Sequence, residues 1–212
     1  DFDKKLTLPS ETTNHLLPMT KKRLAIFASG SGSNAEKIAE YFTGRTDIEI
    51  TLILSNNPQA GVIARARRFH IPVVLFDRKT FYETPRIIEI LQNEHIDLVV
   101  LAGFMMLIPE AMVQAFPEKI VNIHPALLPK YGGKGMYGHF VHEAVVAAQD
   151  LQSGISIHFV NERYDEGNII FQATCEVIPT DTPEDVARKV QVLEHQYYPE
   201  VVDKLLGALT EY

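Results

Sequence analysis

IDLVVLAG, at residues 96–103, is an almost uninterrupted apolar run of strand length. Such a run is typical of a parallel strand that has helices on both faces, because neither face then meets water. Outward from it, strand-like runs alternate with amphipathic, helix-like segments. This alternation predicts right-handed crossover units and a single, doubly wound, mostly parallel α/β sheet. We expect further strands at 24–29, 48–55, 72–76 and 119–123, and helices at 33–42, 60–69, 84–94 and 109–116.

The pattern changes after residue 133. A helix is predicted at 139–149, and two β-rich runs at 154–160 and 168–177 are joined by the polar turn NERYDEG. We interpret the two runs as a late antiparallel strand pair. A long C-terminal helix is predicted at 182–206, because Thr182 can cap it and Pro183 with acidic residues occupies its first turn.

Length and composition are those of one globular domain. The chain has 212 residues, of which 46% are apolar and 22% charged. Residues 1–20 are polar and without pattern, so we expect an N-terminal extension before a domain at residues 21–212. The net charge of −7 argues against a nucleic-acid partner, and any anionic ligand must be held by local donors.

Several classes of protein and site are disfavoured by the sequence. The single cysteine, Cys175, excludes an internal disulfide. His139 and His142 are spaced like metal ligands, but no third ligand follows at a telling distance, so no metal is expected. No secretory signal or membrane-spanning run is visible, so we expect a cytoplasmic protein without a membrane partner.

A glycine-rich loop, SGSGSN at residues 29–34, joins the first strand to the first helix. Its backbone N–H groups can attract an anion at the helix N-terminus. Gly30, Gly32 and Ala35 loosely fit a dinucleotide pattern, yet the second strand ends in LSNNP, without the acid that binds a ribose. We therefore favour a phosphate monoester, with a tight turn that binds nothing as the alternative.

Asn122 and His124 end the fifth predicted strand, in the segment VNIHPALLPKYGG. Alternation along a strand puts both side chains on one side. An amide N–H and an imidazole directed at one point suit an oxyanion. Asp165 can orient His124 or exchange protons with it, although acidic turn residues are usually solvated. Gln191 and Glu194 lie one turn apart on the last helix, where they form either a ligand contact or a solvated face.

Five motifs occur in the order found in phosphoribosylglycinamide formyltransferases: ASGSGSN, AGFMMLIP, NIHPALLPKYGG, SIHFVNERYDEG and LEHQYYP. Over residues 22–206 the chain resembles that family of the folate-dependent formyltransferase superfamily. The resemblance implies transfer of a formyl group from the cosubstrate 10-formyltetrahydrofolate to the amine of glycinamide ribonucleotide, in purine synthesis. It implies a cytoplasmic enzyme acting on small-molecule substrates without a metal, as a monomer or homodimer.

The resemblance also implies roles for individual residues. Asn122, His124 and Asp165 match the catalytic trio. Three features depart from what we expect of the family. At the position of Met106 many members have arginine; Asn168 and the segment GGKGMYGH also differ from the family pattern. The matching substrate-binding residues are Gly32, Ser33, Asn34, Gln191 and Glu194; the matching folate-binding residues are Lys79, Phe104, Met105, Met106, Leu107, Ile108, Val160, Asn161, Glu162, Arg163 and Tyr164.

Four rival interpretations are open at this point. A formyltetrahydrofolate deformylase would use the same trio with water, but we expect it to carry NIHH and an extra N-terminal domain. A methionyl-tRNA formyltransferase is expected to carry a C-terminal domain and more positive charge. A nicotinamide-dependent oxidoreductase would use the glycine loop, and the missing acid after the second strand speaks against it. A binding protein without catalysis would have no use for the trio.

Overall fold

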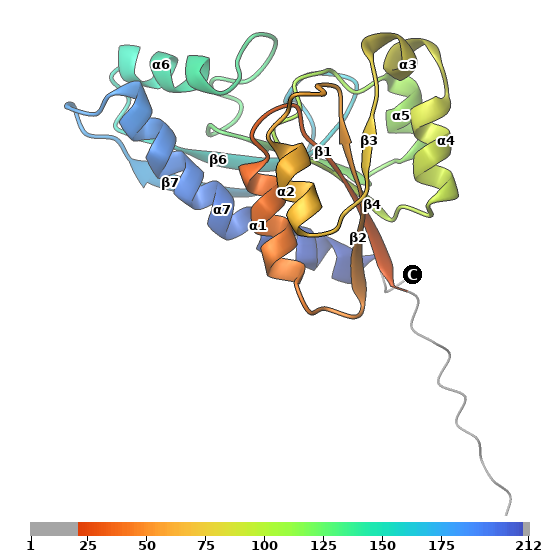
Figure 1. The fold of residues 1–212 in the computed structure, drawn as a ribbon. Coiled ribbons are helices and arrows are strands. Elements are labelled where there is room, and N and C mark those ends of the chain that lie inside the picture. The colour runs from red at the N-terminus through yellow and green to blue at the C-terminus, as the bar shows by residue number, and fades with distance from the viewer. Residues whose placement is uncertain (1–20, 210–212) are drawn as a thin grey trace, which may run out of the picture.

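The structure, a computed structural model, describes residues 21–209; the predicted extension at residues 1–20 lies outside this part. A seven-stranded sheet has the order β3-β2-β1-β4-β5-β6-β7. The first five strands are parallel, whereas β6 is antiparallel to both β5 and β7 (Figure 1). This confirms the predicted mostly parallel sheet with a late antiparallel pair. The strands are β1 (Lys22–Phe27), β2 (Ile48–Ser55), β3 (Val73–Leu75), β4 (Leu98–Leu101), β5 (Ile120–His124), β6 (Gln152–Phe159) and β7 (Ile169–Glu176).

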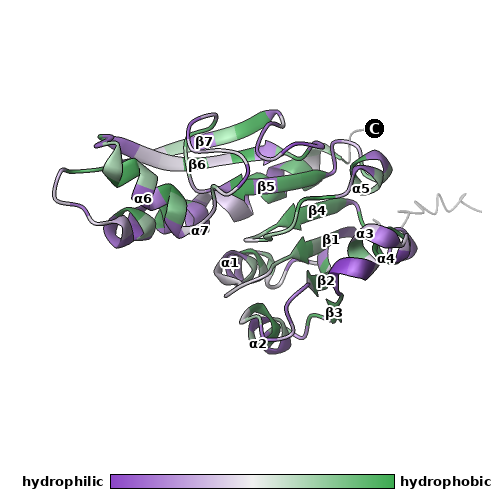
Figure 2. Ribbon diagram, turned by 90° about the horizontal axis from the view of Figure 1, so that it is seen from above, coloured by the Kyte–Doolittle hydropathy of each residue, from purple (hydrophilic) through white to green (hydrophobic). Residues whose placement is uncertain are grey.

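Helices cover both faces of the sheet (Figure 2). Successive residues of a strand face opposite sides, so β1 contributes Leu24 and Ile26 to one hydrophobic cluster and Ala25 and Phe27 to the other. All four are fully buried, as expected for a central parallel strand. One face carries α1 (Ser33–Phe42), α2 (Val62–Arg68), α6 (His139–Ala147) and α7 (Pro183–Ala208); the other carries α3 (Arg78–Glu83), α4 (Arg86–Asn93) and α5 (Glu110–Ala115).

One helix was not predicted. The short α3 begins at the cap Asp77, whose carboxylate accepts a hydrogen bond of 2.7 Å from the Thr80 N–H. Its buried Phe81 stacks on Phe76, with ring centroids 5.1 Å apart. A six-residue helix held by one cap and one aromatic has too few turns to give a periodic pattern. The predicted helix at 84–94 consequently begins later, at Arg86.

The C-terminal helix α7 confirms the prediction at 182–206. Thr182 and Asp185 form a capping box at its start, with Pro183 in the first turn. Farther along, Tyr198 is fully buried, and its hydroxyl lies 2.9 Å from the Leu101 carbonyl and 3.3 Å from the Val121 carbonyl. The hydroxyl therefore ties α7 to the end of β4 and to Val121 of β5, which precedes the predicted catalytic Asn122.

We predict that Tyr198→Phe lowers the free energy of unfolding by about 1 kcal/mol, because two buried carbonyls lose a shared donor while the ring remains. Chemical denaturation measures the change. Tyr197→Phe is the matched control, since the Tyr197 ring keeps its packing on Phe171 at 4.9 Å. Equal stability of Tyr198→Phe and wild type would show that this hydrogen bond does not hold the strands.

Candidate active site

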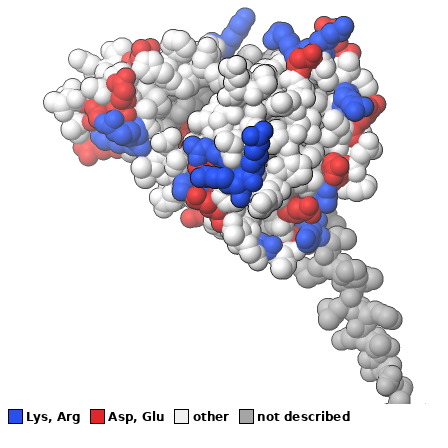
Figure 3. All heavy atoms as spheres, in the orientation of Figure 1, with Lys and Arg blue, Asp and Glu red and all other residues white. Residues whose placement is uncertain are grey.

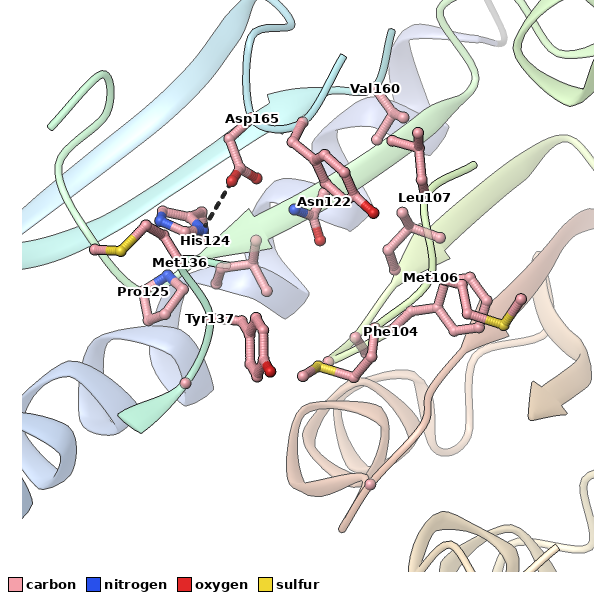
Figure 4. A pocket seen from close by; sticks show the side chains of 18 of the residues that line it. Phe104, Met106, Leu107, Asn122, His124, Pro125, Met136, Tyr137, Val160 and Asp165 are labelled. Atoms are coloured by element: carbon pink, nitrogen blue, oxygen red, sulfur yellow. Dashed lines mark ion pairs between the residues drawn. The ribbon is translucent and has the colours of Figure 1, made fainter. Parts of the chain in front are cut away.

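The cleft lies at the carboxyl ends of the parallel strands. Strands β2 and β3 lie on one side of β1, and β4 lies on its other side, so the strand order reverses between β1 and β4. Ligands of such sheets bind at this reversal of strand order. The cleft has a volume of about 580 Å³ (Figure 4), which is typical of a small-molecule site. Its walls come from residues 30–34, 101–108, 122–125, 133–138, 158, 160, 163–165 and 194.

The glycine loop forms one end of the cleft. Gly32 has φ of +76°, and a Cβ there would lie 2.5 Å from Val62 side-chain atoms, so both conformation and space require glycine. Asn34 donates a 2.9 Å hydrogen bond to Glu194, while the Asn34 Oδ1 is buried without a protein partner. Burial raises the pKa of Glu194, and the Asn34 amide opposes this. The loop thus places polar groups, incompletely paired, beside the N-terminus of α1.

Positive charge gathers near this loop despite the net charge of the chain. Arg65, Arg67 and Arg68 occupy the last turn of α2, and basic side chains cluster over this region in Figure 3. Arg65 Nε donates a 2.8 Å hydrogen bond to the Ser31 carbonyl. Arg65 and Arg68 also pair with Glu36, which neutralises part of their charge. These arginines lie beside the loop but do not line the cleft, so the binding of an anionic ligand by local donors stays a prediction.

The segment at 104–108 forms the apolar wall. Phe104 packs edge-on against Phe27, with centroids 5.2 Å apart, and Ile108 is only 2% exposed. Met105 is half exposed at the cleft, and its backbone N–H donates to Ser29 Oγ at 3.0 Å. Ser29 in turn donates to Asn56 at 2.7 Å. Aromatic packing and this hydrogen-bond chain fix the wall relative to the glycine loop.

His124 is held between a carbonyl and a carboxylate. It is 4% exposed, and its Nε2 lies 2.7 Å from the Tyr131 carbonyl, which can only accept, so Nε2 carries a hydrogen. Its Nδ1 faces Asp165 Oδ2 at 3.5 Å (Figure 4). Burial lowers the pKa of His124; Asp165 and the Tyr131 carbonyl oppose this without overcoming it. Neutral His124 is thus favoured at neutral pH, with its lone pair on Nδ1.

Asp165 connects three elements of the site. Its Oδ2 accepts a 3.0 Å hydrogen bond from the Gly133 N–H, and its Oδ1 lies 3.6 Å from His158 Nε2. Burial alone would raise the pKa of Asp165, but contact with His158, the charge of His124 and the Gly133 N–H together hold it below the ordinary value. Asp165 is therefore an ionised, largely buried carboxylate, not a solvated turn residue.

His158 joins this cluster, which sequence reasoning missed. Its Nδ1 lies 2.8 Å from the Phe159 carbonyl and so carries a hydrogen, while its Nε2 lies 3.2 Å from the Asn122 amide nitrogen and 3.6 Å from Asp165 Oδ1. The feature that would have identified His158 is the register of the antiparallel pair: β6 runs beside β5 so that His158 is paired with Asn122. Residue spacing alone does not supply that register.

Most of the predicted site residues meet in the cleft. Four do not line it: Lys79 lies on α3, Gln191 is exposed on α7, and Asn161 and Glu162 lie in the turn after β6. The roles of these four, like those of the predicted residues that line the cleft, stay predictions. The lining also includes Met136 and Tyr137, from the segment GGKGMYGH. The predicted residues that line the cleft are Gly32, Ser33, Asn34, Phe104, Met105, Met106, Leu107, Ile108, Asn122, His124, Val160, Arg163, Tyr164, Asp165 and Glu194.

Residues 21–209 contain neither a cluster of metal-ligating side chains nor a membrane-spanning helix. Across residues 21–209, no group of three or more His, Cys, Asp or Glu side chains could hold a metal ion. Among the helices of that same part of the chain, none has the length and apolar character needed to cross a membrane.

Comparison with known proteins places this cleft in a family context. The chain is similar to phosphoribosylglycinamide formyltransferases of Arabidopsis thaliana (chloroplastic; 43% identity, covering 90% of this chain and 66% of that protein) and Bacillus subtilis (39%; 88% and 95%). A chloroplastic relative from Vigna unguiculata is 41% identical, and the chain spans 61% of it. The chain thus spans about two thirds of its plant relatives.

Solved structures agree. The crystal structure of phosphoribosylglycinamide formyltransferase from Anaplasma phagocytophilum superposes with a TM-score of 0.81 at 33% identity, covering 89% of each chain. The enzyme from Bacillus halodurans superposes with a TM-score of 0.78 at 38% identity, covering 87% of this chain and 95% of that one. The family model described as "Formyl transferase" matches residues 22–202, the span that builds the sheet and cleft. This chain therefore belongs to the formyl transferase family.

Proposed function

We propose that the chain transfers a formyl group from 10-formyltetrahydrofolate to the amine of glycinamide ribonucleotide, a step of purine synthesis. The names of the Bacillus and Arabidopsis relatives state this kind of activity for those proteins. The observation that carries the proposal is the cluster of Asn122, His124 and Asp165 between a glycine loop and an apolar wall, in one cleft.

The two ends of the cleft suit two different substrates. Gly32, Ser33 and Asn34 would bind the phosphate of the ribonucleotide through backbone N–H groups. The buried Asn34 Oδ1 and the neighbouring Glu194 would accept hydrogen bonds from its polar groups. On the other side, the wall at 104–108, with Val160 and Tyr164, would hold the flat folate ring system by apolar contact.

In this reaction a C–N bond forms to the ribonucleotide amine, the bond from the formyl carbon to the folate nitrogen breaks, and one proton moves between the two nitrogens. Neutral His124 takes that proton at Nδ1, beside Asp165, and returns it to the departing nitrogen. The imidazolium formed in between is stabilised by the Asp165 carboxylate. Asn122 has two amide N–H donors. One points to His158, and the other would stabilise the oxyanion formed on the formyl group.

An absorbance assay of 10-formyl-dideazafolate deformylation, with and without glycinamide ribonucleotide, tests the proposal. Turnover that depends strictly on the ribonucleotide is expected. Equal turnover without it would mean that water is the acceptor and the protein is a hydrolase. Absence of turnover in both conditions would reject the enzyme assignment.

The cytoplasmic location expected from the sequence stays a prediction. The names of the two plant relatives place those proteins in the chloroplast. Fractionation of cells of the source organism, with this chain detected by antibody, would measure the location directly.

We predict that His124→Ala or Asp165→Asn lowers kcat by about 100-fold to 10,000-fold, since each removes part of the proton-transfer machinery. KM for both substrates should change little, because neither side chain is assigned to substrate binding. Steady-state kinetics measure both constants. A variant with near wild-type kcat would remove that residue from the mechanism.

The pH profile offers an independent prediction. Because burial lowers the pKa of His124 and the neutral form begins the reaction, kcat/KM, which reports groups of the free protein, should fall on the acid side with a midpoint below 6.5. The ionisable groups around the ring are Asp165, His158 and, farther away, His142. A midpoint above 6.5 would contradict neutral His124 as the proton acceptor.

We predict that Gly32→Ala raises KM for the ribonucleotide, because a Cβ at φ of +76° collides with Val62 and displaces the loop. The positive φ alone should cost about 1–2 kcal/mol of stability. Gly207→Ala is the control, since a Cβ there meets nothing within 4 Å and φ is not positive. If KM stays at the wild-type value, the loop does not hold the phosphate.

A further inference from the structure

Tyr131 has an unusual backbone conformation behind the catalytic histidine. It is not glycine, yet its φ is +57°, in the left-handed region that disfavours residues with a Cβ. Its carbonyl is the group that accepts the His124 Nε2 hydrogen bond at 2.7 Å. Its side chain does not contribute to the cleft wall. Something outside the cleft must therefore stabilise this conformation.

A carboxylate on the far side of the loop binds two successive side chains. The Tyr131 hydroxyl donates to Asp150 Oδ2 at 2.7 Å, and Lys130 Nζ lies 2.7 Å and 2.5 Å from the two Asp150 oxygens. Residues 128–131 form a turn, in which the Lys130 N–H donates to the Leu127 carbonyl at 3.2 Å. This turn, together with the positive φ of Tyr131, brings both side chains to one acceptor. A hydroxyl bound to an ionised carboxylate is a strong anchor.

The rest of this loop is held at other points. Ser156, on β6, accepts from the Leu128 N–H at 2.9 Å and donates to the Ala126 carbonyl at 2.7 Å. Gly133 donates to Asp165. Asp150 holds the residues between Leu128 and Gly133, which include Tyr131 and its carbonyl.

We propose that Asp150 is a positioning residue: by binding the Tyr131 hydroxyl, it holds the Tyr131 carbonyl against His124 Nε2 and so fixes the imidazole with Nδ1 toward Asp165. This inference rests on the proposed function, in which Nδ1 exchanges the proton. The contact keeps the hydrogen of the neutral ring on Nε2, because a carbonyl cannot donate. Without the anchor, the loop can move and the ring can rotate or change tautomer.

Kinetics of Tyr131→Phe and Asp150→Ala test the proposal. We expect kcat to fall about tenfold in each, since a misplaced proton carrier slows the reaction, while KM for both substrates stays within about twofold. Asp150→Asn, which keeps an oxygen acceptor for the Tyr131 hydroxyl, should recover most of the loss. Tyr41→Phe is the matched control: its hydroxyl donates to Asp203 at 3.1 Å, between α1 and α7 and away from the cleft.

A second measurement separates positioning from general stability. In ¹⁵N NMR spectra of the wild type, neutral His124 should be protonated at Nε2, whereas Tyr131→Phe and Asp150→Ala should show a mixture of both tautomers. This result needs no substrate, so it stands apart from the proposed reaction; lack of wild-type turnover would count against that reaction alone. Unchanged kcat, or a loss of kcat that follows reduced thermal stability while the tautomer is unchanged, would overturn the role of Asp150.

Discussion

The site depends on one buried carboxylate, Asp165, that faces two imidazoles. Its two oxygens lie 3.5 Å from His124 Nδ1 and 3.6 Å from His158 Nε2, and the Gly133 N–H completes its surroundings. A carboxylate in such a place is costly to bury unless hydrogen bonds compensate, and the Gly133 N–H supplies one. The same arrangement makes the proton at Nδ1 of His124 easier to gain. Stability and chemistry therefore depend on the same contacts.

The sheet brings these side chains together. β5 contributes Asn122 and His124 at its carboxyl end, and the antiparallel return of β6 sets His158 beside Asn122. The turn after β6 then carries Asp165, in a left-handed conformation with φ of +56°, back over the strand end. Tyr198 ties the same end of the sheet to α7. Because β5 and β6 run antiparallel, residues from the carboxyl end of β5 and from the carboxyl end of β6 do not meet by strand direction alone; the register of the pair and the turn after β6 bring them into one cleft.

Much of the architecture was predictable because hydrophobic periodicity and capping residues, which are local features of the sequence, determine most of the helices and strands. Helix α1 and strand β2 have the predicted bounds, and Thr182 caps α7 as expected. Asn122 and His124 were identified from strand alternation, from their place at a strand end, and from the resemblance of their motif to the family. The short α3 was missed because one cap and one buried ring leave no periodic signal.

Other features require information that no local pattern contains. His158 reaches the site through strand register. Asp150 lies 19 positions after Tyr131 in the sequence, and α6 separates the two along the chain. Pro125 and Pro129 restrict the backbone of the strand exit after His124. In the structure, Ser156, Asp150 and Asp165 also hold it through hydrogen bonds from three different segments.

The most direct test of this account is an NMR titration of His124 in the wild type and in Asp165→Asn, without substrates. Asp165 favours the protonated imidazole, whereas burial opposes it. The account predicts a wild-type pKa below 6.5 that falls further when the carboxylate is neutralised. A pKa that stays the same or rises in Asp165→Asn would show that the carboxylate does not control His124, and the central interaction of the site would be contradicted.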